Sequence, residues 1–193
     1  GIAPQLAIAY RTYQNALTAP ETRAFRFGAT RPSVAAPEVY VLVLGETCRP
    51  DHWAVNGYSR DTSPRLERLH GLVSFTDVVT QAATTRESVP LIMTRGTAAD
   101  PARVWREPSI IRAFAEAGFR TAWLSTQEVS EFTGRMHHIA AESDTVRFFE
   151  RRHDEVLVAP FEQLLGEVQG VGDKLLVVLH TMGNHSVYEN RVP

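Results

Sequence analysis

The sequence has little cysteine, no long apolar run and no excess of one charge. Its single cysteine, Cys48, excludes an intramolecular disulfide framework. No run of about 18 apolar residues is present, so nothing in the 193 residues predicts a membrane-spanning helix. The 20 Lys and Arg residues are spread along the chain and the net charge is −2, so we expect no nucleic-acid partner. With 44% hydrophobic and 22% charged residues, the composition is that of an ordinary globular domain.

The ends of the sequence also lack familiar features. No initiating methionine or signal peptide stands at the N-terminus. The sequence stops at Pro193 inside a recognisable pattern, so we expect it to be a piece of a longer protein. Residues 1–36 are rich in alanine and interrupted by proline, and apolar positions in Gln5–Leu17 roughly follow a helical period. We expect residues 1–36 to form a helix and an extended linker, and residues 37–193 to form a folded domain.

From Glu38 onward, short apolar runs alternate with amphipathic stretches. The run Val39–Leu44 is continuous, rich in β-branched residues and followed by glycine, which predicts a strand buried on both faces. Further strands are predicted at Leu72–Val79, Thr121–Ser125 and Leu175–Leu179, and helices at Glu107–Gly118 and Val158–Val168. Strand, helix and strand at these spacings predict an α/β fold with right-handed βαβ units, a mostly parallel central sheet and helices on both faces.

Polar segments follow three of the predicted strands. They are Gly45-Glu46, Thr80–Glu87 and His180–His185. Because ligands of open parallel sheets bind beyond the carboxyl ends of the strands, we expect these segments to meet at one edge of the sheet. That edge is the candidate site.

Glu46 follows its apolar strand directly at this edge. A carboxylate there is a hard oxygen ligand for a divalent cation, a general base, or a strand-end group that hydrogen-bonds nearby backbone. Arg49, Asp51 and His52 follow in the same loop, which is either a solvated polar turn or the surround of a phosphate or metal. The sequence leaves these alternatives open.

Thr84 and Thr85 stand where a helix is expected to begin. The spacing of Thr84 and Glu87 is that of a capping box, with Thr84 as the N-cap. Thr85 would then lie in the first turn, where backbone N–H groups and the helix dipole favour an alkoxide or a bound phosphoryl group. Both threonines could equally serve only to cap the helix. A hydroxyl nucleophile needs a lowered pKa, which coordination to zinc would supply.

Two histidines and a glycine follow the last predicted strand, in His180–His185. Gly183 allows the chain to turn sharply there. An imidazole at this place can ligate a metal or protonate a leaving oxygen, or it can be a satisfied polar group at the end of a strand. His137, His138 and His153 lie in segments without such a pattern, and no role is assigned to them.

Taken in order, these motifs resemble those of the lipid A and related phosphoethanolamine transferases, which belong to the alkaline phosphatase/sulfatase superfamily. Val41–His52 with Asn56–Pro64 is similar to the first metal motif of that family and its continuation. Thr84–Pro90 resembles the segment that holds the threonine nucleophile. Leu179–His185 with Asn190–Pro193 resembles the Gly-Ser-His segment and the Arg-Tyr-Pro that follows it.

The resemblance implies an alkaline phosphatase/sulfatase-like sandwich and a role for each motif. Glu46 and Thr85 would bind the catalytic zinc, Thr85 would be the nucleophile, and His185 would lie near the substrate phosphate or a second zinc. The reaction would be ping-pong: phosphatidylethanolamine donates its headgroup to Thr85, and a lipid A, core-sugar or other envelope glycan acceptor takes it. Residues 37–193 would be a catalytic domain in the periplasm. Membrane helices before residues 1–36 would hold it at the bacterial inner membrane.

The sequence departs from the family pattern in three places. The family completes its zinc site with a later Asp-His pair in an Asp-His-Gly-Glu motif, which we expect beyond Pro193. Gln81 and Leu91 stand where many members have a disulfide that flanks the nucleophile, and Cys48 stands where alanine is usual. These departures separate the chain from the best-known lipid A branch and leave the acceptor open.

Two kinds of alternative remain. A sulfatase-type hydrolase or a phosphoglycerol transferase could use the same fold. No Cys/Ser-x-Pro-x-Arg motif of a sulfatase surrounds Thr85, whereas phosphoglycerol transfer also uses a threonine nucleophile. The alternative from a different class is a non-catalytic binding domain that retains the fold.

Overall fold

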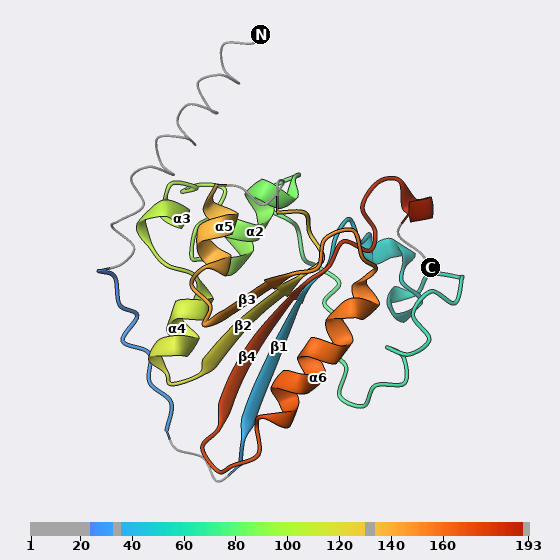
Figure 1. Ribbon diagram of the computed structural model, residues 1–193. Helices are drawn as coiled ribbons and strands as arrows, with labels where there is room; N and C mark the ends of the chain where they lie inside the picture. The colour runs from blue at the N-terminus through green and yellow to red at the C-terminus, as the bar shows by residue number, and fades with distance from the viewer. Residues whose placement is uncertain (1–23, 33–35, 130–133, 191–193) are drawn as a thin grey trace.

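A four-stranded parallel sheet organises the chain in the computed structural model, which describes residues 24–32, 36–129 and 134–190 (Figure 1). The strands lie in the order β1 (Glu38–Leu44), β4 (Lys174–His180), β2 (Arg120–Ser125) and β3 (Thr145–Phe148). All three neighbouring pairs are parallel, which confirms the predicted sheet and three of its predicted strands. The helix expected in Gln5–Leu17 lies outside the described residues.

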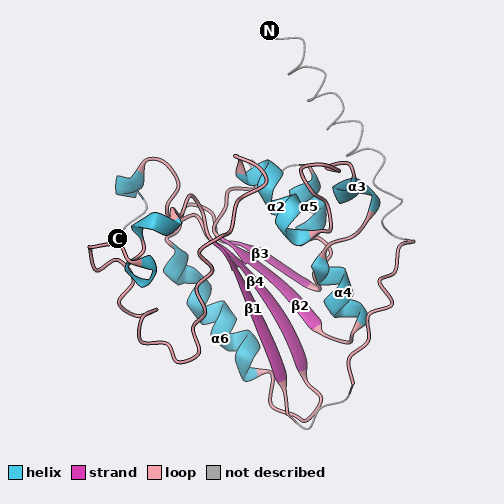
Figure 2. Cartoon of the chain, turned by 180° about the vertical axis from the view of Figure 1, so that it is seen from behind, coloured by secondary structure: helices cyan, strands magenta, loops and turns pink. Residues whose placement is uncertain are grey.

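Helices cover both faces of the sheet, as predicted (Figures 1 and 2). One face carries α6 (Val158–Gly166), and the other carries α2 (Thr85–Met93), α4 (Ile110–Glu116) and α5 (Arg135–Ala140), with α3 (Arg103–Arg106) beside them. Four short 3-10 helices complete the described elements: η2 (Pro50–His52), η3 (Ala54–Asn56), η4 (Asp154–Leu157) and η5 (Tyr188–Asn190). Within the described parts of the chain, no helix is long and apolar enough to cross a membrane.

Side chains that alternate along the strands build a separate core on each face. Trp123 of β2 and Val178 of β4 point to the face covered by α2, α4 and α5. Leu124 and Val177, their neighbours in sequence, point to the face covered by α6. All four side chains are fully buried. Because side chains of a strand alternate between faces, these two cores fix which way each strand faces.

The helices predicted at Glu107–Gly118 and Val158–Val168 exist as α4 and α6, and each is shorter than the sequence indicated. Ser109 is the N-cap of α4, and its hydroxyl accepts a hydrogen bond from the N–H of Ile111 at 3.2 Å. This cap places the first helical turn after Pro108 rather than at Glu107. Beyond the end of α4, Gly118 has a φ of 86°, which a glycine adopts without strain.

The strand predicted at Leu72–Val79 is wrong. The segment is an irregular loop, and Val73, Phe75 and Val79 are each at least 70% exposed. A β-branched and aromatic composition favours a strand because such side chains pack well on a half-buried pleated surface. No described element offers this loop such a surface.

The prediction that β1 is buried on both faces is also wrong for the described part of the chain. Leu42 and Leu44 pack in the core under α2, α4 and α5. On the opposite face of the strand, Val41 and Val43 are 43% and 59% exposed. β1 is an edge of the described sheet, with β4 on one side only, so its apolar run is covered on one face.

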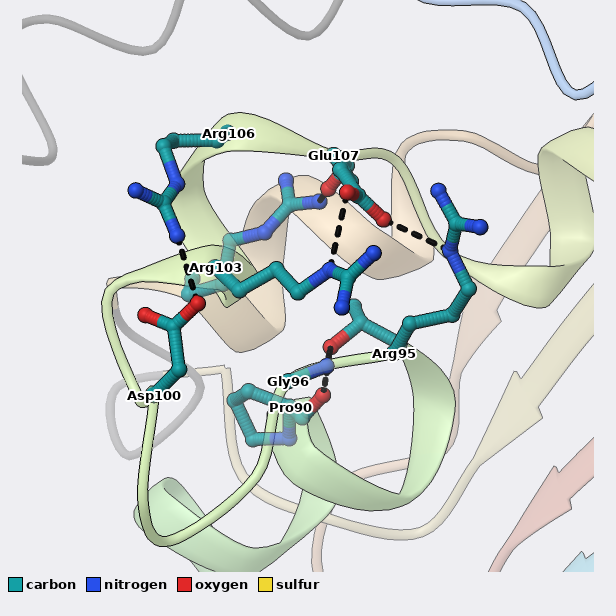
Figure 3. A network of polar contacts seen from close by, with 9 residues as sticks. Pro90, Arg95, Gly96, Asp100, Arg103, Arg106 and Glu107 are labelled. Atoms are coloured by element: carbon teal, nitrogen blue, oxygen red, sulfur yellow. Dashed lines mark hydrogen bonds and ion pairs between the residues drawn. The ribbon is translucent and has the colours of Figure 1, made fainter.

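Ion pairs fix the segment that follows α2 (Figure 3). The carboxylate of Glu107 pairs with Arg95 at 2.7 Å and with Arg103 at 2.8 Å. Asp100 pairs with Arg106 at 2.6 Å. Partial burial alone would raise the pKa of Glu107, but hydrogen bonds from the two guanidinium groups hold this pKa below its usual value. The network ties the end of α2 to α3 and so helps to fix the direction of α2.

Burial of Ile139 should account for a measurable part of the stability. Ile139 of α5 is 0% exposed, whereas Ile92 of α2 is 59% exposed. We expect Ile139→Ala to lower the free energy of unfolding by about 2–5 kcal/mol, because it removes buried methyl groups and leaves a cavity. The matched control Ile92→Ala should change it by less than about 0.5 kcal/mol. Urea unfolding of the two variants checks this, and equal losses would contradict the packing described.

Candidate active site

The register of the sheet sets the ends of three strands level with one another. Leu44 of β1 and Ser125 of β2 both pair with His180 of β4. The segments that begin at Gly45, Thr126 and Thr181 therefore leave the sheet at the same edge. This is the edge where the sequence predicts a site.

Glu46 and Thr85 meet at this edge, although they are far apart in sequence. The hydroxyl of Thr85 donates a hydrogen bond to Oε2 of Glu46 at 2.8 Å. The hydroxyl of Thr47 donates to Oε1 of the same carboxylate, also at 2.8 Å. Glu46 is 8% exposed, so a carboxylate is held almost out of water with a threonine hydroxyl directed at it.

The start of α2 places Thr85 in the first helical turn. Thr84 is the N-cap, with an extended backbone, and its carbonyl accepts hydrogen bonds from the N–H groups of Glu87 and Ser88. The side-chain part of the predicted capping box is different: the Thr84 hydroxyl lies 3.3 Å from Oε2 of Glu87 and does not cap a backbone N–H. Thr85 Oγ1 therefore lies at the positive end of the helix dipole.

His185 lies on the turn that follows β4. Its N–H donates to the carbonyl of Met182 at 2.9 Å, which closes the turn Met182–His185. Its ring nitrogen Nδ1 lies 3.3 Å from both the carbonyl and the hydroxyl oxygen of Ser186. Among the described residues, the hydrogen-bond partner of this ring is Ser186, and neither Glu46 nor Thr85 forms a hydrogen bond with it. The structure thus brings two of the three predicted site residues together.

His180 has a different position from His185. It ends β4, is 1% exposed and lies edge-to-face with Trp123 at a centroid distance of 5.5 Å. Burial lowers the pKa of His180 to about 4, an effect that the nearby Glu46 and Asp154 carboxylates partly oppose. The imidazole is therefore neutral at pH 7 and part of the packed interior.

Two polar residues that lie at the site were not predicted from the sequence. Gln127, which is buried, donates from Nε2 to the carbonyl of Thr181 at 2.6 Å and lies 3.5 Å from Oε2 of Glu46. Asp154 accepts from the hydroxyl of Thr126 and from the N–H of Met182. A signal was present for Gln127, because it follows a predicted strand by two residues, as Glu46 does. Asp154 carried no comparable signal.

The loop after Glu46 is a solvated polar turn. Arg49 and Asp51 form an exposed ion pair at 2.5 Å, and the hydrogen bond from Arg49 lowers the pKa of Asp51. His52 is exposed and stacks on Tyr58 at a centroid distance of 4.9 Å. Of the alternatives that the sequence left open, this arrangement favours the solvated turn over a metal surround.

The described residues offer part of a metal site. The Glu46 carboxylate and the Thr85 hydroxyl are oxygen ligands of a kind that zinc accepts. Within the described ranges, no group of three or more His, Cys, Asp or Glu side chains could hold a metal ion. The donors therefore fit zinc in kind, with fewer of them than the three protein ligands of a typical catalytic zinc site.

Comparison with known proteins decides the family. Residues 38–193 match the family model for sulfatases. The chain belongs to the sulfatase family. The fold agrees with this, because the C-terminal periplasmic domain of EptC from Escherichia coli superposes with a TM-score of 0.72 at 25% identity, over 86% of this chain and 50% of that one. The same domain in complex with zinc gives a TM-score of 0.71 at 24% identity, over 86% of this chain and 51% of that one.

Related sequences carry the name phosphoethanolamine transferase. The phosphoethanolamine transferase CptA of Salmonella typhimurium is 28% identical over 170 residues, which are 82% of this chain and 29% of that protein. The chain thus spans less than a third of the length of this relative and about half of the solved EptC domain.

Burial of a neutral His180 should make stability depend on pH. Above pH 6.5 the side chain is neutral in both the folded and the unfolded state. Between pH 6.5 and about 4 it takes up a proton mainly in the unfolded state, so the free energy of unfolding should fall as the pH falls, by about 3 kcal/mol in total.

Unfolding of wild type and His180→Asn by urea, at several pH values in metal-free buffer, measures this contribution. The pH slope between 6.5 and 4 should be smaller in His180→Asn. His52→Asn, which changes an exposed histidine, is the matched control and should keep the wild-type slope. Equal slopes in wild type and His180→Asn would contradict the buried, neutral state.

Proposed function

We propose that the chain carries the nucleophile of a phosphoethanolamine transferase, and that this nucleophile is Thr85. The observation that supports this most strongly is the hydrogen bond from Thr85 Oγ1 to the Glu46 carboxylate at the start of α2. The names of the related transferases support the group that is transferred. Membership of the sulfatase family and the EptC fold support the architecture around the pair.

The proposed reaction has two steps, both at Thr85. In the first, Oγ1 attacks the phosphorus of phosphatidylethanolamine, the bond to the diacylglycerol oxygen breaks, and Thr85 becomes a phosphoethanolamine diester. Oε2 of Glu46 accepts the hydrogen bond of the Thr85 hydroxyl, so it faces the proton that this hydroxyl loses. The diacylglycerol oxygen takes up a proton as it leaves. In the second, an acceptor oxygen attacks the same phosphorus and the Thr85 hydroxyl is restored. We propose that His185 supplies a donor to the substrate phosphate or the leaving oxygen.

The chain's own geometry contributes to both steps. The N–H groups of the first turn of α2 and the helix dipole stabilise negative charge that develops at Thr85. Glu46 is nearly buried, which strengthens its interactions at this edge. Zinc, held by Glu46 and Thr85 with further ligands outside the described residues, would stabilise the alkoxide and the transferring phosphoryl group. Zinc in the EptC domain of E. coli supports the choice of metal.

The place of the reaction is part of the same proposal. The solved EptC domain is periplasmic and C-terminal in its own protein. We propose that residues 37–193 are part of a periplasmic catalytic domain and that residues 1–36 connect it to helices in the inner membrane. The donor would then be phosphatidylethanolamine of that membrane. The acceptor would be lipid A, a core sugar or another envelope glycan.

A covalent adduct on Thr85 tests the proposed nucleophile. We expect the full-length protein, incubated with phosphatidylethanolamine vesicles, to carry a phosphoethanolamine group on the peptide that contains Thr85. Thr85→Val keeps the shape of the side chain but removes the hydroxyl, so the adduct should be lost. Tandem mass spectrometry of the digested protein locates the group.

Thr84→Asn is the matched control, because it removes the neighbouring hydroxyl and keeps a good helix N-cap. The adduct should remain in this variant. A glycerophosphate group on Thr85 would keep the nucleophile and change the donor to a phosphoglycerol lipid. An adduct that persists in Thr85→Val, or no adduct with zinc and intact donor present, would overturn the proposal.

A further inference from the structure

We propose that Asp154 is a positioning residue that holds the turn Met182–His185, and through it His185, at the carboxyl edge of the sheet. The inference rests on the proposed function, in which His185 acts on the transferring group. Asp154 begins η4, which lies between β3 and β4 in sequence. It is half-buried and contacts neither Glu46 nor Thr85 through any hydrogen bond among the described residues.

One carboxylate oxygen of Asp154 joins two strand ends. Oδ1 accepts a hydrogen bond from the hydroxyl of Thr126 at 2.5 Å and another from the N–H of Met182 at 2.9 Å. Thr126 is the first residue after β2, and Met182 is the second after β4. Both donors are on buried residues, so loss of the acceptor would leave them without a partner away from water.

The other carboxylate oxygen fits against the next residue of the turn. A Cβ built on Gly183 would lie 2.7 Å from Oδ2 of Asp154, closer than side-chain carbons come to such an atom. Glycine at position 183 therefore lets the turn lie directly against the carboxylate. A side chain at position 183 would force either the carboxylate or the turn to shift, and either shift would strain the hydrogen bond between Asp154 and Met182.

The same turn carries His185. Asp154 holds the N–H of Met182, and the carbonyl of Met182 accepts a hydrogen bond from the N–H of His185. These two hydrogen bonds connect Asp154 to the residue that carries the imidazole. The start of the turn is fixed on its other side by Thr181, whose N–H donates to the carbonyl of Leu44 at 3.0 Å.

Beyond the point where the strand ends, the turn is held by Asp154 at Met182 and by Cys48, whose Sγ accepts a hydrogen bond from Nδ2 of Asn184 at 3.0 Å. Asp154 is the contact at the start of the turn.

A shift of this turn would move His185, whereas Thr85 lies on α2, to which Asp154 makes no hydrogen bond among the described residues. A displacement of about 1 Å in a reacting group can slow a reaction on the order of 100-fold. We therefore expect Asp154→Ala to slow formation of the Thr85 adduct on the order of 10- to 100-fold. Asp154→Asn keeps an oxygen that can accept both hydrogen bonds, so it should retain most of the wild-type rate.

A double-mutant cycle separates positioning from general destabilisation. The full-length protein is mixed with vesicles of headgroup-labelled phosphatidylethanolamine, and the single-turnover rate of Thr85 labelling is measured. If Asp154 acts through His185, then Asp154→Ala should slow the reaction in wild type and change it by less than about two-fold in a His185→Ala background. Glu155→Ala, the exposed neighbouring carboxylate in η4, is the control and should keep the wild-type rate.

Additive losses in the double variant would overturn the inference, and so would a His185→Ala variant that labels at the wild-type rate. Hydrogen exchange tests the same point without the reaction. The amides of the turn should exchange faster with solvent in Asp154→Ala than in wild type, and at the wild-type rate in Glu155→Ala. Amides of the turn that stay protected in Asp154→Ala would also overturn the inference. If wild type itself never labels, the proposed function fails, and exchange alone then decides whether Asp154 holds the turn.

Gly183→Ala provides a second route if Asp154→Ala does not fold. The added methyl group meets Oδ2 of Asp154 and should separate the carboxylate from the turn, with faster amide exchange and slower labelling. A Gly183→Ala variant with wild-type exchange and labelling would show that the carboxylate does not fix the turn.

Discussion

The parallel register of β1, β4 and β2 is the constraint on which the site depends. Leu44 and Ser125 both pair with His180 in the sheet. The loops that carry Glu46 and Gln127 and the turn Met182–His185 therefore begin at the same edge of the sheet. A slip of one residue would turn every side chain of a strand to the opposite face. The two cores oppose such a slip, because the side chains of β2 and β4 are buried alternately on both faces of the sheet.

Beyond the sheet, polar side chains hold the loops to one another. Gln127 donates a hydrogen bond to the carbonyl of Thr181. Asp154 accepts one from the N–H of Met182, and Glu46 accepts one from the hydroxyl of Thr85. Each such hydrogen bond contributes about 1–3 kcal/mol to stability, which is small beside the burial of the two cores. Their main effect is geometric: two of them fix loops that leave different strands against each other, and the third fixes the loop after β1 against the start of α2. The direction of α2 is set separately, by its packing on the sheet and by the ion pairs of Glu107 and Asp100 beyond its end.

Local features explain what the sequence could predict. Glu46 and Thr85 were predicted because one follows a strand and the other begins a helix, and both features can be recognised from neighbouring residues. The strand order was not predictable from spacing, because β4 enters between β1 and β2 although it comes last in the chain. Asp154 was missed for the same reason: its partners lie in loops that only this order brings together. Leu72–Val79 was predicted wrongly because its composition favours a strand without showing whether a partner strand exists. The roles of Glu46, Thr85 and His185 stay predictions.

The most direct test of the account is the position of zinc in the full-length protein. Crystals grown with zinc, with diffraction data collected on both sides of the zinc absorption edge, give that position without any assumption about the reaction. The account predicts an anomalous peak for a zinc ion that is bound by the Glu46 carboxylate and Thr85 Oγ1, at about 2.0–2.2 Å from each oxygen. A peak elsewhere in the protein, with the Thr85 hydroxyl still donating to Glu46, would contradict it.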